Sequence, residues 1–316
     1  MDASSKGWLD SDGVVVEFGA HVNFLGDWRM SMEGAPPLWL VLPLLMEFGF
    51  GQVFKWATQH RCYAPTVVST NYWVLASILL LYLGFTGQLH VPVGAVKVGA
   101  ITGTVFISSM LLMTRLLRTF RVASVLTAFR LAIVVPVGLG VLLWNEPLGG
   151  LQLLGLGLAL VAVLLMSRHA GHHTNVPRWI ATGLLILVFS IQGMSTSCLR
   201  WVHYAGLDDA YLQVLMVIGF TAGAIGATVL LWEARQRIRR FDLAVGAGIG
   251  VYNLLALMAV LIALKHVPGT VFFPLVGCGV VILDNVTAPL LWKEPISRAA
   301  VLGVGVGVLA VILVVQ

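Results

Sequence analysis

The sequence predicts an all-α polytopic membrane protein in which ten transmembrane helices form two inverted five-helix repeats. Three observations lead to this fold class. Of the 316 residues, 59% are hydrophobic and 10% are Asp, Glu, Lys or Arg, whereas soluble domains carry roughly 25% charged residues. Ten long apolar stretches divide the chain, and a segment near its middle recurs near its end. So few charges exclude a soluble globular enzyme and a disordered protein.

The apolar stretches have the length that a bilayer requires, since a spanning helix needs about 20 mostly apolar residues. They are continuously apolar, which argues against a transmembrane β-barrel with its alternating pattern. Breaks at charged residues, Pro, Gly and Asn predict helices over residues 38–57, 66–85, 91–114, 120–144, 150–167, 178–200, 210–232, 241–264, 268–292 and 298–315.

Residues 1–36 differ in character from the rest of the chain. No basic region followed by an apolar core begins them, so we expect no cleavable signal peptide. We expect instead an acidic N-terminal tail, either mobile or at the membrane interface. It carries six of the 14 acidic residues, namely Asp2, Asp10, Asp12, Glu17, Asp27 and Glu33. The three cysteines are far apart and predict free thiols rather than a disulfide framework: Cys62, Cys198 and Cys278.

The second half of the chain repeats the first. The segment from residue 142 reads LLWNEPLGGLQLLGLG, and the segment from residue 290 reads LLWKEPISRAAVLGVG. Upstream, GAITG at residues 99–103 matches GAGIG at residues 246–250. An odd number of helices in each copy makes the second copy enter the membrane from the opposite side, as in many secondary transporters. We therefore expect five-helix units over 37–168 and 178–316, joined by a linker over 169–177.

The loop charges orient these helices. Five of the 19 Lys and Arg lie on the side of the tail (Lys6, Arg29, Lys97, Arg200 and Lys265), and Arg130 lies within a helix. Because cytoplasmic loops carry an excess of Lys and Arg, we expect both termini outside the cytoplasm of an integral protein of the bacterial inner (plasma) membrane. The other side holds Lys55, Arg61, Arg115, Arg118, Arg121, Arg168, Arg178, Arg235, Arg237, Arg239, Arg240, Lys293 and Arg298.

Residues 122–166 resemble the end of an EamA-like domain, in which a Pro-containing helix ends in aromatic-x-Glu and a Gly-rich helix follows. Residues 274–315 resemble a second such domain. The resemblance covers the architecture of about residues 37–316 and implies the drug/metabolite transporter superfamily in its ten-helix form. It implies a central cavity between the halves and a secondary transporter that moves a small metabolite or drug-like solute by alternating access, with proton coupling or exchange. Family members usually have both termini in the cytoplasm, whereas the charges here favour the reverse.

Ionisable side chains at membrane depth are the first candidates for function, because each is costly unless it is paired or faces water. Glu47 resembles the helix-one glutamate of small multidrug resistance proteins, which couple transport to protons; a protonated structural Glu is the alternative. Arg130 lies deep in its helix, where it either pairs with Glu47 or binds an anionic substrate group; a structural ion pair is the alternative. Asp284 is predicted to bind a cation or proton, or to pair with Arg130 or Lys97.

Other polar residues complete the predicted central cavity. Most such groups bridge helices, and a minority contact substrate. Snorkelling to the interface is favoured over cavity lining for Lys97 and for Lys55. Glu146 and Glu294 are predicted to turn the chain and cap the next helix. The cavity set is Gln52, Asn285, Lys97, Asn71, Tyr72, Gln192 and Asn253.

Two motifs suggest other functions. The histidines of SRHAGHHTN have metal-like spacing, but no Cys or acid lies near them, which predicts a solvated basic loop and neither metal nor cofactor. His203 and Asp208 match the H-x-x-x-x-D spacing of lipid acyltransferases, which leaves a lipid-modifying enzyme as an alternative. A channel is the third interpretation, although no filter motif is present.

We expect no enzymatic activity and no nucleic acid partner. The expected partners are a small-molecule substrate, protons and the lipid bilayer around a monomer or homodimer.

Overall fold

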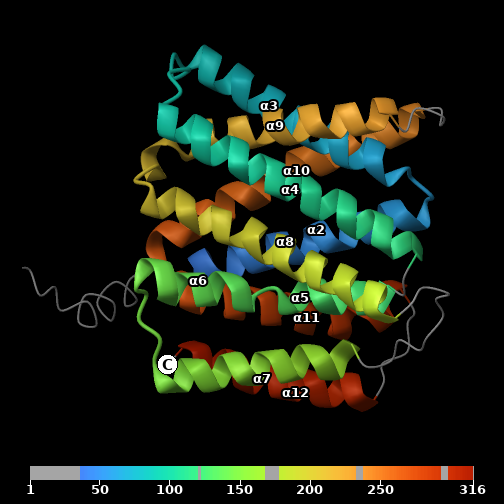
Figure 1. Ribbon diagram of the computed structural model, residues 1–316, viewed down its shortest axis with the longest axis vertical. Helices are drawn as coiled ribbons and strands as arrows, with labels where there is room; N and C mark the ends of the chain where they lie inside the picture. Colours follow the sequence, from blue (N-terminus) through green and yellow to red (C-terminus); the bar gives the residue numbers. More distant parts are fainter. Residues whose placement is uncertain (1–35, 120–121, 168–177, 233–237, 293–297, 316) are drawn as a thin grey trace, which may run out of the picture. The chain divides into compact units, whose positions relative to one another are not determined.

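The computed structural model describes residues 36–119, 122–167, 178–232, 238–292 and 298–315 (Figure 1). Over these residues the regular secondary structure is helical, with no β-strand, which confirms the predicted all-α class. The acidic tail, the linker with its histidines, and Glu294 lie outside the described residues.

Each apolar stretch predicted above corresponds to helix among the described residues, and the stretch over 120–144 corresponds to two helices. The elements are α2 (Pro36–Gln59), α3 (Ala64–Phe85), α4 (Val93–Thr119), α5 (Val122–Leu131), α6 (Val134–Trp144), α7 (Gly150–Ser167), α8 (Arg178–Tyr204), the 3₁₀ helix η1 (Asp208–Ala210), α9 (Tyr211–Trp232), α10 (Arg240–His266), α11 (Gly269–Trp292) and α12 (Arg298–Val315).

Six segments of the described chain are long and apolar enough to cross a bilayer. They make the chain a polytopic integral membrane protein, as the composition predicted. They are Ala64–Phe85, Val93–Leu116, Thr182–Tyr204, Asp208–Trp232, Arg240–His266 and Gly269–Leu291.

The prediction of one continuous helix over 120–144 is wrong at its midpoint. The segment divides into α5 and α6 just before Pro136. Proline has no N–H and cannot donate to the carbonyl four residues earlier. The carbonyl oxygen of Ala132 instead accepts the N–H of Val135 at 3.0 Å, one residue short of the α-helical partner. The break leaves Arg130 in the last turn of α5.

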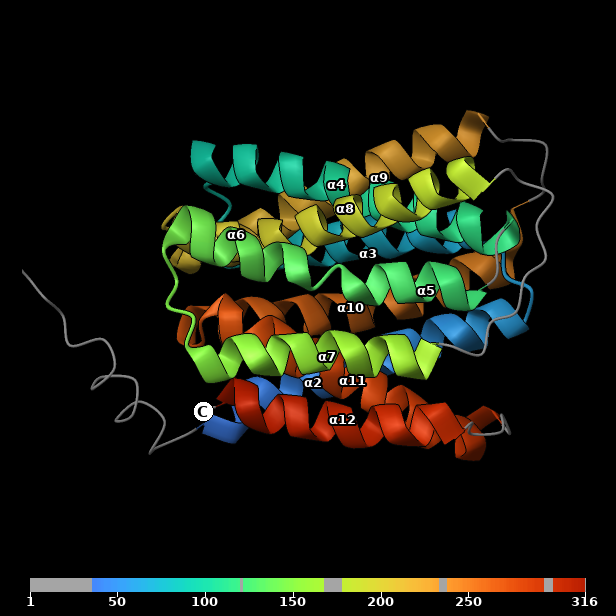
Figure 2. The same ribbon diagram turned by 60° about the horizontal axis from the view of Figure 1, so that its bottom comes forward.

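Glycines allow α4 and α10 to approach other helices closely. Gly99 and Gly103 of α4 lie against α9, and Gly246 and Gly250 of α10 lie against α3. A Cβ on Gly103 would stand 2.7 Å from the carbonyl oxygen of Ile218, and one on Gly250 would stand 2.7 Å from that of Asn71. The interpretation that these glycines serve helix packing is therefore supported by their contacts. Figures 1 and 2 show α3, α4 and α9 side by side, with α7 against α12.

At one end of the helices, which we call the basic end, the α2–α3 turn is fastened to α10. Arg239 donates to the buried Asp242 carboxylate at 2.8 Å and to the carbonyl oxygen of Arg61 at 3.0 Å. Burial, and then the neighbouring Asp242 carboxylate, raise the pKa of the Cys62 thiol. All three cysteines are free, as predicted; Cys198 and Cys278 are buried, and Cys62 is half-buried.

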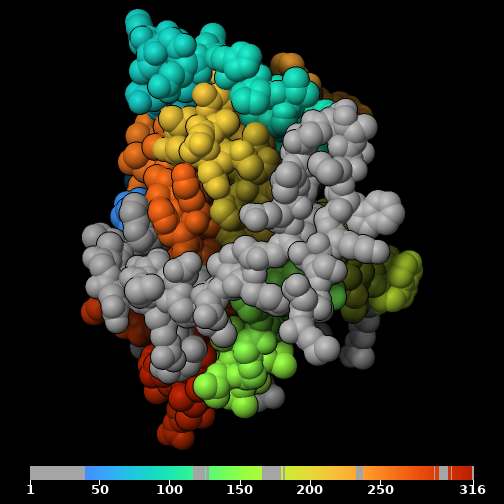
Figure 3. All heavy atoms as spheres, turned by 90° about the vertical axis from the view of Figure 1, so that its left-hand side faces the viewer, coloured from blue at the N-terminus to red at the C-terminus, as the bar shows by residue number. Residues whose placement is uncertain are grey.

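The opposite end carries the α3–α4, α6–α7, α8–α9 and α10–α11 connections, and Figure 3 looks onto it. The residues around 85–93 (cyan) adjoin those around 205–213 (yellow) in this view. Gln213 donates to the carbonyl oxygen of Gln88 at 3.2 Å, which joins these two connections.

Two glycine-to-alanine changes in α10 are expected to have opposite effects on stability. Gly250→Ala places a methyl group against rigid backbone and should lower the melting temperature, in keeping with overpacking costs of about 1–3 kcal/mol. A Cβ on Gly248 would meet no atom of a neighbouring element within 4 Å in the described part of the chain, so Gly248→Ala should keep or raise the melting temperature through the better helix propensity of Ala. Thermal unfolding of the purified variants measures both, and equal melting temperatures would contradict the close α3–α10 approach.

Candidate functional site

Three predicted site residues from separate helices meet at membrane depth. Arg130 Nη2 of α5 lies 2.6 Å from Asp284 Oδ2 of α11. Gln52 Nε2 of α2 donates to Asp284 Oδ1 at 2.8 Å. Both carboxylate oxygens therefore have a donor, and we call Gln52, Arg130 and Asp284 the central cluster. Of the partners predicted for Arg130, the structure selects Asp284.

The three residues lie at a similar depth. Asp284 precedes the end of α11 by eight residues, and Arg130 follows the start of α5 by eight. At 1.5 Å per residue, each is about 12 Å from the basic end. Gln52 precedes the end of α2 by seven residues. The contacts thus join α5 to α2 and α11, which run in the opposite direction, at the depth that Gln52, Arg130 and Asp284 share.

Two further charges act on the central cluster. Glu47 of α2 is half-buried and interacts electrostatically with Arg130 and with Tyr252 of α10. Lys55, three residues after Gln52, is half-buried and acts electrostatically on Asp284. The sequence favours an interfacial role for Lys55, because nothing along α2 indicates that an acid of α11 lies beside it.

The ion pair of the central cluster is only partly enclosed. The side chains of Arg130 and Asp284 keep 28% and 29% of their exposure. An ion pair that is only partly enclosed by protein can exchange one partner for a proton, a cation or an anionic group at a lower cost than a fully buried pair.

Several of the other predicted cavity residues lie elsewhere. Asn253 of α10 donates to Asn71 of α3 at 3.1 Å, and both side chains are buried. Gln192 of α8 accepts a hydrogen bond from Ser109 of α4 at 2.6 Å. These contacts match the helix-bridging role expected of most such groups. Tyr72 is 1% exposed in a hydrophobic cluster between α3, α4 and α9.

The last two predicted residues have other surroundings. Lys97 is exposed near the start of α4, in keeping with the favoured interfacial role. Asn285 adjoins Asp284 in sequence, and its amide donates to the carbonyl oxygen of Val281 on the same helix at 2.9 Å.

A second ion pair, which the sequence does not reveal, lies near the end opposite the basic end. Arg200 Nε of α8 donates to Glu146 Oε1 at 2.6 Å, and the two side chains are 5% and 2% exposed. Arg200 also donates to the carbonyl oxygens of Leu264 and Val267, which end α10. We call the Glu146–Arg200 pair the latch. The position of Arg200 near a helix end indicates no more than an interfacial charge.

The latch also fastens α11. The second carboxylate oxygen of Glu146 accepts the N–H of Thr270, in the first turn of α11, at 2.8 Å. Tyr204 donates to Glu146 at 3.1 Å and stacks on Trp144 with a ring-centroid distance of 5.0 Å. Glu146 therefore caps a helix, as predicted, but that helix is α11 rather than the next one in sequence. A carboxylate at a helix N-terminus is favoured by the helix dipole.

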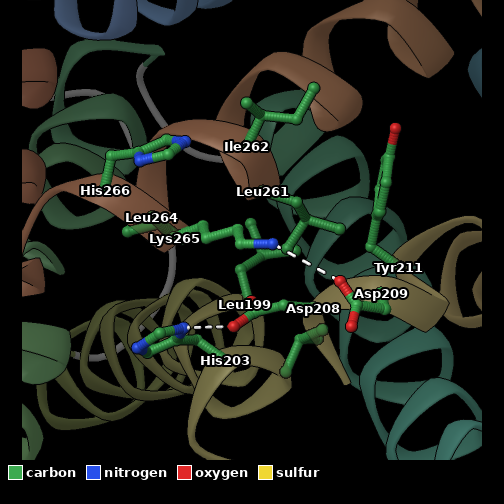
Figure 4. Close-up of a pocket in the computed structure, with 11 residues that line it drawn as sticks. Leu199, His203, Asp208, Asp209, Tyr211, Leu261, Ile262, Leu264, Lys265 and His266 are labelled. Carbon is green, nitrogen blue, oxygen red and sulfur yellow. Dashed lines mark hydrogen bonds and ion pairs between the residues drawn. The ribbon is translucent and has the colours of Figure 1, made fainter. Parts of the chain in front are cut away.

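The structure also brings together the two residues of the acyltransferase-like spacing. His203 Nδ1 lies 2.7 Å from Asp208 Oδ2. Both line a cavity of about 370 Å³ at the end opposite the basic end (Figure 4).

No protein-family model matches the chain, and no curated protein matches it. Solved structures do resemble it. One, described as the crystal structure of a protein, aligns with 86% of this chain and 94% of its own length, with a TM-score of 0.69 and 14% sequence identity. The chain therefore has a fold that is also found in a solved crystal structure.

Breaking the latch is expected to destabilise the protein strongly. Glu146→Gln leaves the buried Arg200 without a counter-charge, and losing one partner of a buried ion pair typically costs about 3–5 kcal/mol. The melting temperature of the purified variant should fall by many degrees. Asp209→Asn is the matched control, because Asp209 pairs with Lys265 in an exposed position and should change stability little. Equal melting temperatures for the two variants would contradict a stabilising latch.

Proposed function

We propose that this protein is an EamA-like secondary transporter of the drug/metabolite superfamily, with ten spanning helices in two inverted repeats. The observation that carries the proposal is the central cluster: an exchangeable ion pair at membrane depth, formed between the two halves of the chain. The substrate is a small charged or zwitterionic solute, and alternating access moves it across a plasma membrane. The loop charges favour termini on the non-cytoplasmic side.

The helix packing supports the inverted repeat. Gly103 packs on the carbonyl oxygen of Ile218, and Gly250 packs on that of Asn71. The two glycines are 147 positions apart, and so are their two partners. Three pairs of equivalent helices also have equal lengths: 22 residues for α3 and α9, 27 for α4 and α10, and 18 for α7 and α12. Reciprocal contacts of this kind are what a pseudo-twofold axis between the halves produces.

The broken helix over 122–144 supports a site near Arg130. Irregular backbone at membrane depth is tolerated only where protein or a water-filled cavity satisfies its polar groups, and transporter sites are commonly built at such breaks. The break lies two residues beyond Arg130. In this proposal α5 and α6 move partly independently, so that the central cluster rearranges while the latch stays closed.

The two ion pairs suggest a gating order. The latch is buried at one end, whereas the central cluster is partly open and nearer the basic end. This arrangement fits a state that admits solute from the basic end. A substrate or a proton that binds at Asp284 or Arg130 shifts the protein to another conformation only if it binds the two conformations with different affinities. Coupled transport requires this difference in affinity.

Neutralising Glu47 is expected to remove proton coupling. The Glu47→Gln variant keeps the shape of the side chain but cannot release a proton. A thermal-shift screen of a metabolite panel identifies a solute, and uptake of that solute into proteoliposomes is then followed with and without an imposed pH gradient. The variant should lose the response to the gradient and keep the melting temperature of the parent protein. Proton dependence equal to that of the parent protein would exclude the proton role.

Substitutions in the ion pair separate a structural role from a binding role. Asp284→Asn leaves Arg130 unbalanced and should reduce uptake at least about tenfold, a change of about 1.4 kcal/mol. The double variant Arg130→Met/Asp284→Leu removes both charges. Replacing both members of a structural ion pair by apolar residues often restores the stability that the loss of one member removes. We expect the double variant to be folded, by melting temperature, yet inactive in uptake. Recovery of uptake in the double variant would show that the pair only holds the helices together.

A lipid-modifying enzyme is the second candidate, and the His203–Asp208 contact of 2.7 Å is the observation that favours it. We expect purified protein to leave phospholipids and acyl donors unchanged, as judged by mass spectrometry of the reconstituted lipid. Product that disappears in His203→Ala would establish the enzyme instead.

A further inference from the structure

The cavity that contains His203 and Asp208 lies where three membrane spans stop. One span ends at Tyr204, the next begins at Asp208, and a third ends at His266. The cavity is therefore at the level of the lipid headgroups, where amphipathic rings such as that of Tyr211 are common. Its volume of about 370 Å³ is sufficient for a small ligand. We call it the interfacial cavity, and it is lined by Leu199, Val202, His203, Asp208, Asp209, Tyr211, Leu261, Ile262, Leu264, Lys265 and His266.

An apolar stripe leads along α10 to this cavity. Val251 and Leu255 are exposed, and Met258 and Ile262 are half-buried. These positions recur at intervals of four, three and four residues, so they share one face of the helix. Exposed apolar side chains on a membrane span face acyl chains, and the stripe reaches the cavity at Ile262. An acyl chain on the stripe would therefore have its headgroup at the cavity mouth.

The polar lining holds opposite charges on separate elements. Lys265 Nζ of α10 lies 3.4 Å from Asp209 Oδ1 of η1. The Asp209 side chain is fully exposed, and that of Lys265 is 46% exposed, so their pairing is weak and easily replaced. Figure 4 shows Lys265 directed toward Asp209, with His266 on the same helix and the His203–Asp208 pair below. A ligand with an anionic and a cationic group can contact both sides of this lining.

We propose that the interfacial cavity binds a phosphoethanolamine zwitterion, supplied by the headgroup of a phosphatidylethanolamine whose acyl chain follows the α10 stripe. Its phosphate would contact Lys265 and His266, and its ammonium would contact Asp209 and Asp208. A primary ammonium donates three hydrogen bonds to carboxylates, whereas choline requires an aromatic cage. Among the described residues of the lining, Tyr211 is the one Phe, Tyr or Trp, which favours ethanolamine over choline. The proposal requires a membrane protein but no transport activity.

Lipid titration of the full-length chain in detergent tests this site. Delipidated protein receives dioleoyl phosphatidylethanolamine, phosphatidylcholine or phosphatidylglycerol in mixed micelles, and the melting temperature is followed. We expect the ethanolamine lipid to raise it at the lowest lipid concentration. Lys265→Gln and Asp209→Asn should each raise the half-saturating concentration of that lipid about tenfold. Both side chains are exposed, so both variants should fold.

The control is Arg240→Gln, an exposed cation at the other end of α10, which should respond to the ethanolamine lipid as the parent protein does. Soluble glycerophosphoethanolamine distinguishes the two sources of the group. If only the lipid raises the melting temperature, the ligand is a membrane lipid headgroup. If the soluble compound raises it equally, the site binds the same phosphoethanolamine group as a free solute. Equal responses to all three lipids, or variants that respond as the parent does, would overturn the proposal.

Discussion

A charged side chain among apolar helices is stable only where an opposite charge or a set of hydrogen-bond partners meets it. Two ion pairs meet this requirement, Arg130 with Asp284 and Glu146 with Arg200. Each pair joins a residue before position 168 to one after position 178. The Asn71–Asn253 bond also crosses between the halves. The polar groups of the bundle thus fix how the two halves pack together, which apolar contacts alone specify weakly.

The two ion pairs differ in a way that matches different roles. The latch is almost fully buried, and Glu146 also accepts the N–H of Thr270 at the start of α11. Both oxygens of its carboxylate already have donors, so its contribution is to hold α6, α8 and α11 together. The Arg130–Asp284 pair retains more than a quarter of its exposure and can exchange a partner. The helix break between α5 and α6 lies between Arg130 and Glu146 along the chain, and in the proposed transport mechanism it lets one pair change while the other persists.

The helix positions could be predicted from the sequence because the apolar character of each segment depends only on its own residues. The same holds for the depth of Arg130 and Asp284, which follows from counting along a helix. The Arg130–Asp284 pair was one of the alternatives that the sequence left open, but the partners of Lys55 and Arg200 could not be predicted. Lys55 and Arg200 stand near helix ends and resemble interfacial charges, although each acts on an acid from another part of the chain. Proline was also ambiguous: the helix before Pro136 breaks, whereas α11 continues through Pro274 and Pro289.

The sequence by itself determined that this is a helical membrane protein with few, isolated charges within its apolar segments, because transfer free energy and helical periodicity are properties of a segment alone. Only the tertiary structure decided which of those charges face one another. Pairing depends on the rotation of each helix and on the identity of its neighbours, and both are set by close contacts such as those of Gly103 and Gly250 with the backbone of other helices. The central cluster, the latch and the interfacial cavity all arise at that level, since each combines residues that are far apart in the sequence.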